Sequence, residues 1–373
     1  MIVKLGEVAR ECRNTWKESK EEVPVVGLEH LEPGEITLSA WDIDSENTFS
    51  KKFSAGQVLL GRRRVYLRKA VLAPMDGICS GDITVIEALP NKILPELLPF
   101  IIQNDAFFNY AMKGSAGSLS PRVKWEHLQD YEFALPSLSE QRVLADKLWA
   151  AYRLKESYKK LLKATDEMVK SQFIEMFGTV EDNRYNYPMI TIGQMVETIN
   201  YGTSKPAQDG GQYGYLRMNN ITYDGKLDLS DLKYINLSPE YDIKYFVQKG
   251  DLLFNRTNTK EFVGKTTVFD RNEKMVVAGY IIKVVLKPNY MPQYVAGYLN
   301  SHYGKALLKK MAKGAVHQAN INAQEFQSIK ILDVPIESQK QYLTILQQAD
   351  KSKFELNKSI EAIDAVIKSL INN

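Results

Sequence analysis

The chain has 373 residues, of which 44% are hydrophobic and 25% charged, so it is long enough for two ordinary domains that each bury a core. No stretch approaches the roughly 20 consecutive apolar residues of a membrane helix, and the N-terminus lacks a signal-peptide core, so we expect a cytoplasmic protein with no membrane partner. Two cysteines are too few for a disulfide framework, and a net charge of +3 does not by itself indicate a nucleic-acid partner.

The first half of the chain predicts short strands that alternate with turns and short helices. Residues 53–62 predict a turn at a glycine, an apolar strand and then a basic loop, and residues 82–87 predict a β-branched strand. An apolar helix is expected over 95–112, followed by a Lys-Gly turn and a strand that ends at Pro136. The basic loop holds five positive charges within residues 61–69 and no acid. Such a cluster alone is more often a solvated loop than a phosphate-binding site.

Residues 139–178 and 337–373 predict two long amphipathic helices that share one heptad frame. Shifting the second helix by 198 residues superposes its apolar positions on those of the first and aligns Lys353 with Lys155 and Gln339 with Gln141. Heptads sustained over this length favour a coiled-coil seam, so we expect the helices to pair antiparallel. The alternative is two unrelated surface helices, each packed on its own domain.

The segments before the helices repeat as well. Residues 247–256 parallel 53–62, and a second apolar helix, Lys-Gly turn and strand follow over 292–335. We therefore predict an α+β fold with two duplicated globular domains, each followed by a long helix. The expected boundaries are residues 1–136 and 181–335 for the domains and residues 137–180 and 336–373 for the helices.

The sequence lacks the motifs of several enzyme classes. Gly264–Thr266 echoes the end of a phosphate-binding loop, but the first glycine of that motif is replaced by Thr259. The four histidines are scattered without metal-ligand spacing, which predicts no metal site. Asp82 and Asp251 each follow a glycine and are more simply turn residues before strands than catalytic acids. These absences favour a binding or scaffolding protein without catalysis.

Polar loops outside the core pattern are the candidate binding elements. Arg can form two hydrogen bonds with guanine, Asn and Gln can do so with adenine, and Lys, Ser and Thr suit phosphates. The first half is rich in Arg and the second in Asn and Gln, so the two halves should prefer different bases. The candidate DNA-contacting residues are His30, Arg62, Arg63, Arg64, Arg68, Lys69, Ser118, Arg122, Thr203, Lys205, Arg217, Asn219, Asn220, Arg256, Asn258, Lys260, His317, Gln318 and Asn320.

Taken over the whole chain, this pattern resembles the specificity subunit of type I restriction–modification systems. The most specific segments are Leu135–Gln141 and Ser171–Gly178 at the ends of the first long helix, together with Gly250–Arg256 and Gly314–Asn322. The second helix start departs from the pattern, because Val334–Gln339 is one residue shorter than its counterpart. The first half also has Ser118 where the second has a glutamine.

The resemblance implies a bipartite DNA site, with one half-site for each recognition domain and an unspecified gap set by the helices. It also implies association with two adenine methyltransferase subunits and with restriction subunits. S-adenosylmethionine and ATP with magnesium would then be bound by these partners, and this chain would bind no cofactor.

Two other functions stay open from the residues alone. A non-enzymatic coiled-coil adaptor could use its globular domains to bind proteins, and it would lack the steep salt dependence of DNA binding. A nuclease is the weaker alternative, because Glu18-Ser-Lys20 lacks the preceding Pro-Asp pair of a metal-nuclease signature.

Overall fold

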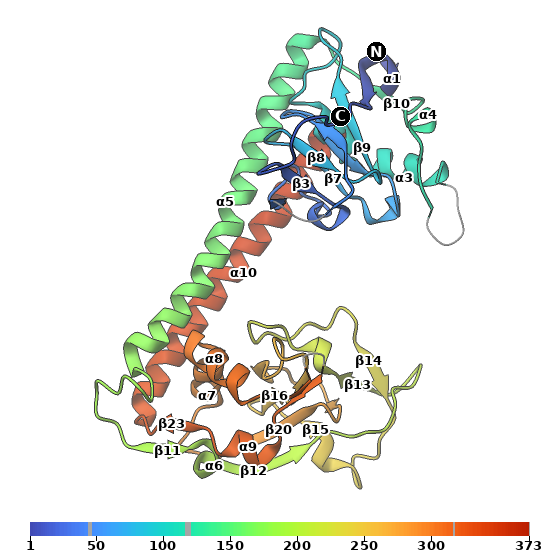
Figure 1. The fold of residues 1–373 in the computed structure, drawn as a ribbon. Coiled ribbons are helices and arrows are strands. Elements are labelled where there is room, and N and C mark those ends of the chain that lie inside the picture. Colours follow the sequence, from blue (N-terminus) through green and yellow to red (C-terminus); the bar gives the residue numbers. More distant parts are fainter. Residues whose placement is uncertain (44–46, 116–120, 316–317, 373) are drawn as a thin grey trace. The chain divides into compact units, whose positions relative to one another are not determined.

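The computed structural model describes residues 1–43, 47–115, 121–315 and 318–372. The chain divides into two compact units: unit 1 comprises residues 1–160 and 356–373, and unit 2 comprises residues 161–355 (Figure 1). Each unit combines a globule with part of each of the two long helices, α5 (Leu138–Phe177) and α10 (Ile336–Asn372).

The globule of unit 1 contains two four-stranded sheets, with strand orders β2-β9-β6-β7 and β4-β3-β8-β5, and a separate antiparallel pair, β1-β10. Within the second sheet β3 and β8 run parallel, and the other neighbours are antiparallel. The strands are β1 (Ile2–Lys4), β2 (Ala9–Cys12), β3 (Pro24–Val26), β4 (Asp42–Ile43), β5 (Lys51–Phe53), β6 (Val58–Gly61), β7 (Ala70–Leu72), β8 (Gly77–Cys79), β9 (Ile83–Ala88) and β10 (Glu132–Ala134). The helices are α1 (Leu5–Val8), η1 (Leu28–His30), η2 (Val65–Leu67), α2 (Leu98–Ile102), α3 (Asp105–Lys113) and α4 (Trp125–Leu128).

Unit 2 repeats this topology. Its two four-stranded sheets are ordered β12-β20-β16-β18 and β14-β13-β19-β15, with β13 and β19 parallel, and β11 pairs with β23. The strands are β11 (Met189–Thr191), β12 (Val196–Tyr201), β13 (Tyr213–Leu216), β14 (Lys233–Ile235), β15 (Phe246–Val247), β16 (Leu252–Asn255), β17 (Thr257–Asn258), β18 (Thr266–Val268), β19 (Met275–Val277), β20 (Ile281–Leu286), β21 (Lys313–Ala315), β22 (Gln318–Asn320) and β23 (Lys330–Leu332). The helices are α6 (Ile192–Met195), η3 (Met218–Asn220), η4 (Ile243–Tyr245), α7 (Pro292–Asn300), α8 (His302–Met311) and α9 (Ala323–Gln327).

The central strands of both units are apolar because they are covered on both faces. All four residues of β6 and all four of β16 are buried, so these strands, apart from Asn255 at the end of β16, read as continuous apolar runs rather than as alternating ones. In unit 2 the end of α5 completes the core, where Phe173 packs edge-on against Tyr342 of α10 with ring centroids 5.2 Å apart. Phe173 also stacks on Tyr294 of α7. The long helices are therefore part of each core.

The apolar helices expected over 95–112 and 292–312 are each divided into two. Asn104 caps α3 by accepting a hydrogen bond from the amide of Ala106, and Ser301 caps α8 by accepting one from Gly304. Both caps have extended backbone, which interrupts the helix although the apolar pattern continues across it. The turn expected at Lys313 is also different, because Lys313–Ala315 forms the strand β21, in which Gly314 has a φ of 116°.

In unit 1 the start of α5 pairs with the end of α10. The ammonium of Lys155 lies 2.7 Å from the Asp364 carboxylate. In unit 2 the end of α5 pairs with the start of α10, where Lys353 lies 3.1 Å from Asp166. The 198-residue offset aligns Lys155 with Lys353 and Asp166 with Asp364, so the two bridges are equivalent. The predicted α+β duplication and the antiparallel pairing of the helices are confirmed.

The shared glutamines at the helix starts have equivalent roles. Gln141 is buried, accepts a hydrogen bond from the amide of Leu94 at 2.9 Å and donates one to the Pro136 carbonyl at 3.0 Å. Gln339 is equally buried, accepts from the amide of Met291 at 2.8 Å and donates to the Val334 carbonyl at 2.7 Å. Each side chain satisfies two backbone groups and so fixes a long helix to its own globule.

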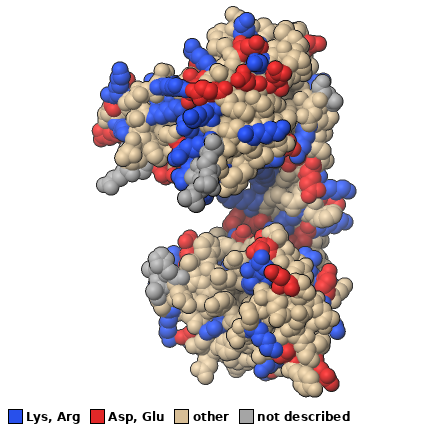
Figure 2. Space-filling model, turned by 90° about the vertical axis from the view of Figure 1, so that its right-hand side faces the viewer, with Lys and Arg blue, Asp and Glu red and all other residues tan. Residues whose placement is uncertain are grey.

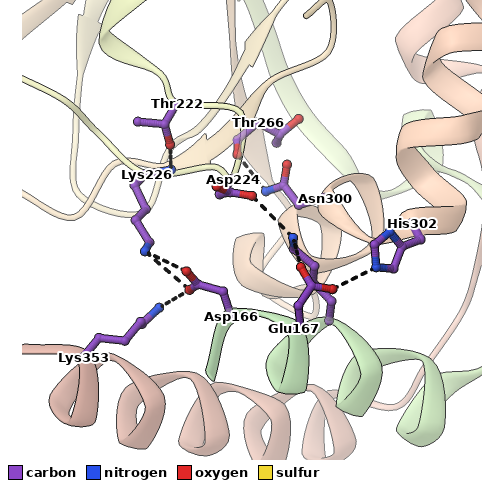
Figure 3. Close-up of polar contacts among 10 residues, drawn as sticks. Asp166, Glu167, Thr222, Asp224, Lys226, Thr266, Asn300, His302 and Lys353 are labelled. Carbon is purple, nitrogen blue, oxygen red and sulfur yellow. Dashed lines mark hydrogen bonds and ion pairs between the residues drawn. The ribbon is translucent and has the colours of Figure 1, made fainter. Parts of the chain in front are cut away.

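Ion pairs join the globule of unit 2 to its helices (Figure 3). Asp166 of α5 lies between Lys353 of α10 and Lys226 of the loop before β14, at 3.1 and 3.4 Å. One position along α5, Glu167 accepts from Lys170 at 2.9 Å and lies 3.0 Å from the ring nitrogen of His302 on α8. The loop and α8 are thereby held against the helix pair.

Candidate nucleic-acid interface

The basic loop of unit 1 follows β6, and two arginines form ion pairs with Asp82 there. Arg122 donates to the Asp82 carboxylate at 2.7 Å, and Arg63 lies 3.6 Å from it. The hydrogen bond from Arg122 lowers the pKa of Asp82, so the carboxylate stays charged and holds both guanidinium groups. Arg64, by contrast, is exposed and has a φ of 53°, in the left-handed region. Asp82 is thus a structural anion in this loop, as its position before a strand predicted.

Three other candidates in unit 1 have partners within the protein. Arg68 forms an ion pair with Asp105 of α3, and Lys69 donates to the Leu28 carbonyl at 2.7 Å. The Nδ1 atom of His30 accepts a hydrogen bond from the amide of Gly27 at 3.0 Å within η1. DNA would have to share or displace these partners to gain a contact.

Arg62 of unit 1 and Arg256 of unit 2 occupy equivalent positions. Each directly follows the central strand of its sheet, and each carbonyl accepts a hydrogen bond at 2.9 Å, from the amide of Val123 in unit 1 and of Ile321 in unit 2. The backbone amide of Arg62 donates to the carbonyl of Asp82, just before β9, and that of Arg256 donates to the carbonyl of Tyr280, just before β20, both at 2.9 Å. Both side chains have a buried Nε atom without a hydrogen-bond partner among the described residues. The duplication therefore places one incompletely bonded arginine at the same point of each globule.

Arg256 lies beside the small sheet β17-β22-β21. Its guanidinium stacks over the exposed ring of Tyr201, 4.9 Å from the ring centre. Thr257 and Asn320 are register partners in β17 and β22, and the Thr257 hydroxyl donates to the Asn320 side chain at 3.4 Å. Gln318 and Lys260 at the edge of this region are exposed. The structure thus brings together four of the predicted residues, namely Arg256, Gln318, Asn320 and Asn258.

Several predicted contacts in unit 2 also serve the fold. Thr203 is buried, and its hydroxyl accepts from the amide of Lys205, whose ammonium lies 3.2 Å from Asp242. Arg217 lies 2.8 Å from Asp231. Asn220 is buried and bridges two backbone groups, while its neighbour Asn219 is exposed.

Asn258 serves the fold as well. Its side chain donates to Asn255 at 2.9 Å, and its oxygen accepts from the amide of Thr259. Ser118 and His317, which were also predicted to contact DNA, lie outside the described residues.

Sequence reasoning missed two kinds of residue in unit 2. The aromatic residues Tyr201, Tyr223 and Phe262 are exposed next to the basic loops, although aromatic side chains usually signal a core position. Lys305 of α8 was missed as well, because a lysine at helical spacing indicates a solvated face. The one sequence feature that indicated Tyr201 was its position at the start of a loop that contains glycine and proline.

The charge distribution differs between the units. On the face drawn in Figure 2, Lys and Arg side chains gather in several patches on unit 1, whereas unit 2 is mostly uncharged with scattered charges of both signs. Among the described residues no helix is long and apolar enough to cross a membrane. The same part of the chain holds no group of three or more His, Cys, Asp or Glu side chains that could bind a metal ion.

Comparison with known proteins identifies the family. Residues 186–364 match the family described as the type I restriction modification DNA specificity domain. A Methanocaldococcus jannaschii protein, named as a type I restriction enzyme MjaX specificity subunit, is 31% identical over 182 residues, 48% of this chain and 42% of that protein. The EcoKI specificity subunit of Escherichia coli is 20% identical over 277 residues, 69% of this chain and 60% of that protein. In both alignments less than two thirds of the relative's length is covered.

Solved structures share the fold along the whole chain. One chain from a structure titled as the basis of complex assembly and conformational transition of the type I R-M system has a TM-score of 0.59 at 19% identity, covering 100% of this chain and 96% of its own. The type I S subunit of M. genitalium has a TM-score of 0.53 at 12% identity, with the same coverage. The resemblance predicted from the sequence is confirmed: residues 186–364 match the DNA specificity domain of type I restriction–modification systems, and the similar proteins are named as specificity subunits of these systems.

Proposed function

We propose that this chain is the non-catalytic subunit that reads a bipartite site in double-stranded DNA. Each recognition domain, residues 1–136 and 181–335, would bind one half-site, and the helices over 137–180 and 336–373 would set the unspecified gap. Two adenine methyltransferase subunits and the restriction subunits would be directed to the site by this chain. These partners would bind S-adenosylmethionine, ATP and magnesium.

The equivalence of Arg62 and Arg256 is the observation that carries this proposal. Each of the two guanidinium groups has an Nε–H donor without a partner among the described residues of the protein. Such a donor can bind an acceptor of another molecule, and both guanine edges and phosphates offer acceptors.

The side chains around Arg62 and Arg256 differ, which supports binding of different base sequences by the two domains. In unit 1 the neighbouring side chains are Arg63, Arg64 and Arg122, whose cations favour guanine edges and phosphates. In unit 2 the neighbours are Gln318 and Asn320, whose amides match the hydrogen-bonding edge of adenine. We infer that the half-sites differ in sequence.

Exchange of one domain tests the proposal. Residues 181–335 are replaced by the matching domain of a relative, the chain is expressed with its methyltransferase partner, and methylated adenines are mapped in the genome. One half-site should change while the other half-site and the gap remain. A change in both half-sites would contradict independent reading by the two domains.

Salt dependence separates the proposal from the adaptor alternative. Affinity for random-sequence DNA should fall steeply between about 50 and 200 mM salt, because each neutralised phosphate adds about 0.9 to the logarithmic slope. Binding that is absent, or insensitive to salt, would support the adaptor instead.

A further inference from the structure

One face of α8 lines a hollow of about 260 Å³ in unit 2. His302, Lys305 and Lys309 lie on this face at helical spacing, as does Ala306. Tyr223, Glu261 and Val263 complete the lining from two loops. The hollow is separate from the small sheet that carries Gln318 and Asn320.

The ammonium of Lys305 is buried in this hollow and has no hydrogen-bond acceptor among the described residues. It lies 4.7 Å from the centre of the Tyr223 ring, a contact that satisfies none of its three N–H donors. The two nearby lysines are different, because Lys170 is paired with Glu167 and Asp224, and Lys265 donates to the Met218 carbonyl. Burial lowers the pKa of Lys305 to about 8, and the charge of the nearby Asp224 carboxylate offsets this loss of water only in part.

The other charges around the hollow favour an anion. Lys309 adds a second cation, which is exposed, and His302 is held in place by its 3.0 Å contact with Glu167 (Figure 3). Glu261 is the one acid among the described residues of the lining, and it is exposed, so solvent screens its charge. Asp224 lies outside the lining and is paired with Lys170. An anion with several oxygens could accept from Lys305 and Lys309 together.

The hollow adjoins the loop that carries the candidate base contacts of unit 2. Glu261 and Val263 belong to the same segment as Arg256 and Lys260. Between them, exposed Phe262 meets the exposed ring of Tyr223 edge-on, with centroids 5.9 Å apart. The candidate base contacts and the hollow are therefore joined by one continuous segment of the chain.

We propose that this hollow binds one phosphate group of the DNA backbone, with Lys305 as its principal donor and Lys309 as the second. The proposal rests on the function proposed above and extends it: Lys305 would fix the register of the second half-site without reading a base.

The test replaces Lys305 by Met in the full chain, which removes the charge and keeps an apolar stem of similar length. Lys310→Met is the matched control, because Lys310 is an exposed lysine of the same helix that does not line the hollow. Affinity for a duplex with the recognised site and for random DNA is measured from 50 to 200 mM salt. At 50 mM salt, Lys305→Met should weaken both by about tenfold, the scale of one charged hydrogen bond, and leave their ratio unchanged.

The salt response gives a second readout. Loss of one phosphate contact lowers the logarithmic slope by about 0.9, so Lys305→Met should lose about 3.5-fold less affinity across this fourfold salt range than the parent chain. A duplex with one neutral methylphosphonate, moved along the second half-site, locates the phosphate. At one position the neutral group should weaken binding of the parent chain and leave binding of Lys305→Met unchanged.

Other results would overturn the proposal in distinguishable ways. If the parent chain binds DNA and Lys305→Met binds with the same affinity and slope, the hollow holds no phosphate. Weaker association with the methyltransferase subunit at unchanged DNA affinity would mean that the hollow receives an acidic protein side chain. If the parent chain itself fails to bind DNA, the proposed function is wrong and this inference fails with it.

Discussion

The bridge between Lys155 and Asp364 predicts unequal effects for removal of its two partners. The Lys155 side chain is 12% exposed and that of Asp364 is 44% exposed, so the lysine has lost most of its water and the aspartate has not. Asp364→Ala leaves a buried ammonium without its acceptor. Lys155→Met leaves a carboxylate that water still solvates, and the Met side chain fills the space of the lysine stem.

The expected sizes follow from this asymmetry. An unsatisfied buried cation costs about 2 kcal/mol here, because Lys155 keeps a little access to water. Exchange of a buried ion-pair partner for an apolar side chain of similar volume is often neutral, so Lys155→Met should cost less than about 0.5 kcal/mol. Once the ammonium is gone, removing Asp364 should cost little more, which gives a coupling of about 1.5 kcal/mol between the two positions.

Thermal unfolding of the full chain measures these values. At about 2–4 °C for each kcal/mol, Asp364→Ala should lower the Tm of unit 1 by about 4–8 °C and Lys155→Met by less than about 2 °C. Glu361→Ala is the control for the change to Ala, because Glu361 is exposed on the same helix. A Lys155→Met variant as unstable as Asp364→Ala, or additive losses in the double variant, would refute the reasoning from burial.

Three further predictions concern the candidate interface. Asp82 has a lowered pKa in the folded chain, so its stabilisation is present above the ordinary value of 3.8 and is lost as the pH falls below it; a Tm series in acid should show this loss, and Asp82→Asn should remove it. Asn220→Ala should lower the unfolding free energy of unit 2 by about 2 kcal/mol, because it leaves two backbone groups unsatisfied, whereas Asn219→Ala at an exposed position should leave the Tm unchanged. Arg62→Gln and Arg256→Gln should each relax the methylated sequence in one half-site only, and mapping of methylated adenines that shows both half-sites altered by either change would contradict the assignment.

The duplicated features were predictable because their physical cause lies in the sequence itself. Two helices with one heptad frame must bury the same stripe, and Gln141 and Gln339 keep one spacing because each satisfies backbone groups of its own globule. Asp166 and Asp364 share that spacing as well, but charged residues at helical positions are usually solvated. Their role became visible only when the structure placed a buried lysine opposite each of them.

The helix breaks at Asn104 and Ser301 could not be read from periodicity. Apolar residues continue on both sides, and only the side-chain bonds to Ala106 and Gly304 show where each helix restarts. The strand pair β21-β22 is similar, since Lys313-Gly314 is as typical of a turn as of a strand.

The candidate site was less predictable than the fold, because one residue type serves two roles. Asn219 and Asn220 are neighbours with the same chemistry, yet one is exposed and the other caps η3. Their roles depend on which of the two side chains the short helix η3 directs toward the backbone groups of Arg217 and Asp228. Lys305 shows the converse error, since an ordinary helical lysine becomes distinctive only when the Tyr223 loop covers it.

The two equivalent arginines suggest how one fold, present in two copies, can bind two different base sequences. The backbone bonds around Arg62 and Arg256 are matched, so the fold fixes where each side chain starts. The groups beside the two guanidiniums are different, with Asp82 and its cations in unit 1 and the Tyr201 ring in unit 2. Asp82 takes part in the matched bonds through its backbone carbonyl, and Tyr201 is the last residue of β12, so the two units differ here in side chains and not in the backbone bonds around the arginines. Substitutions at Arg122 or Tyr201 should therefore alter which bases are bound more than they alter the stability of the globule.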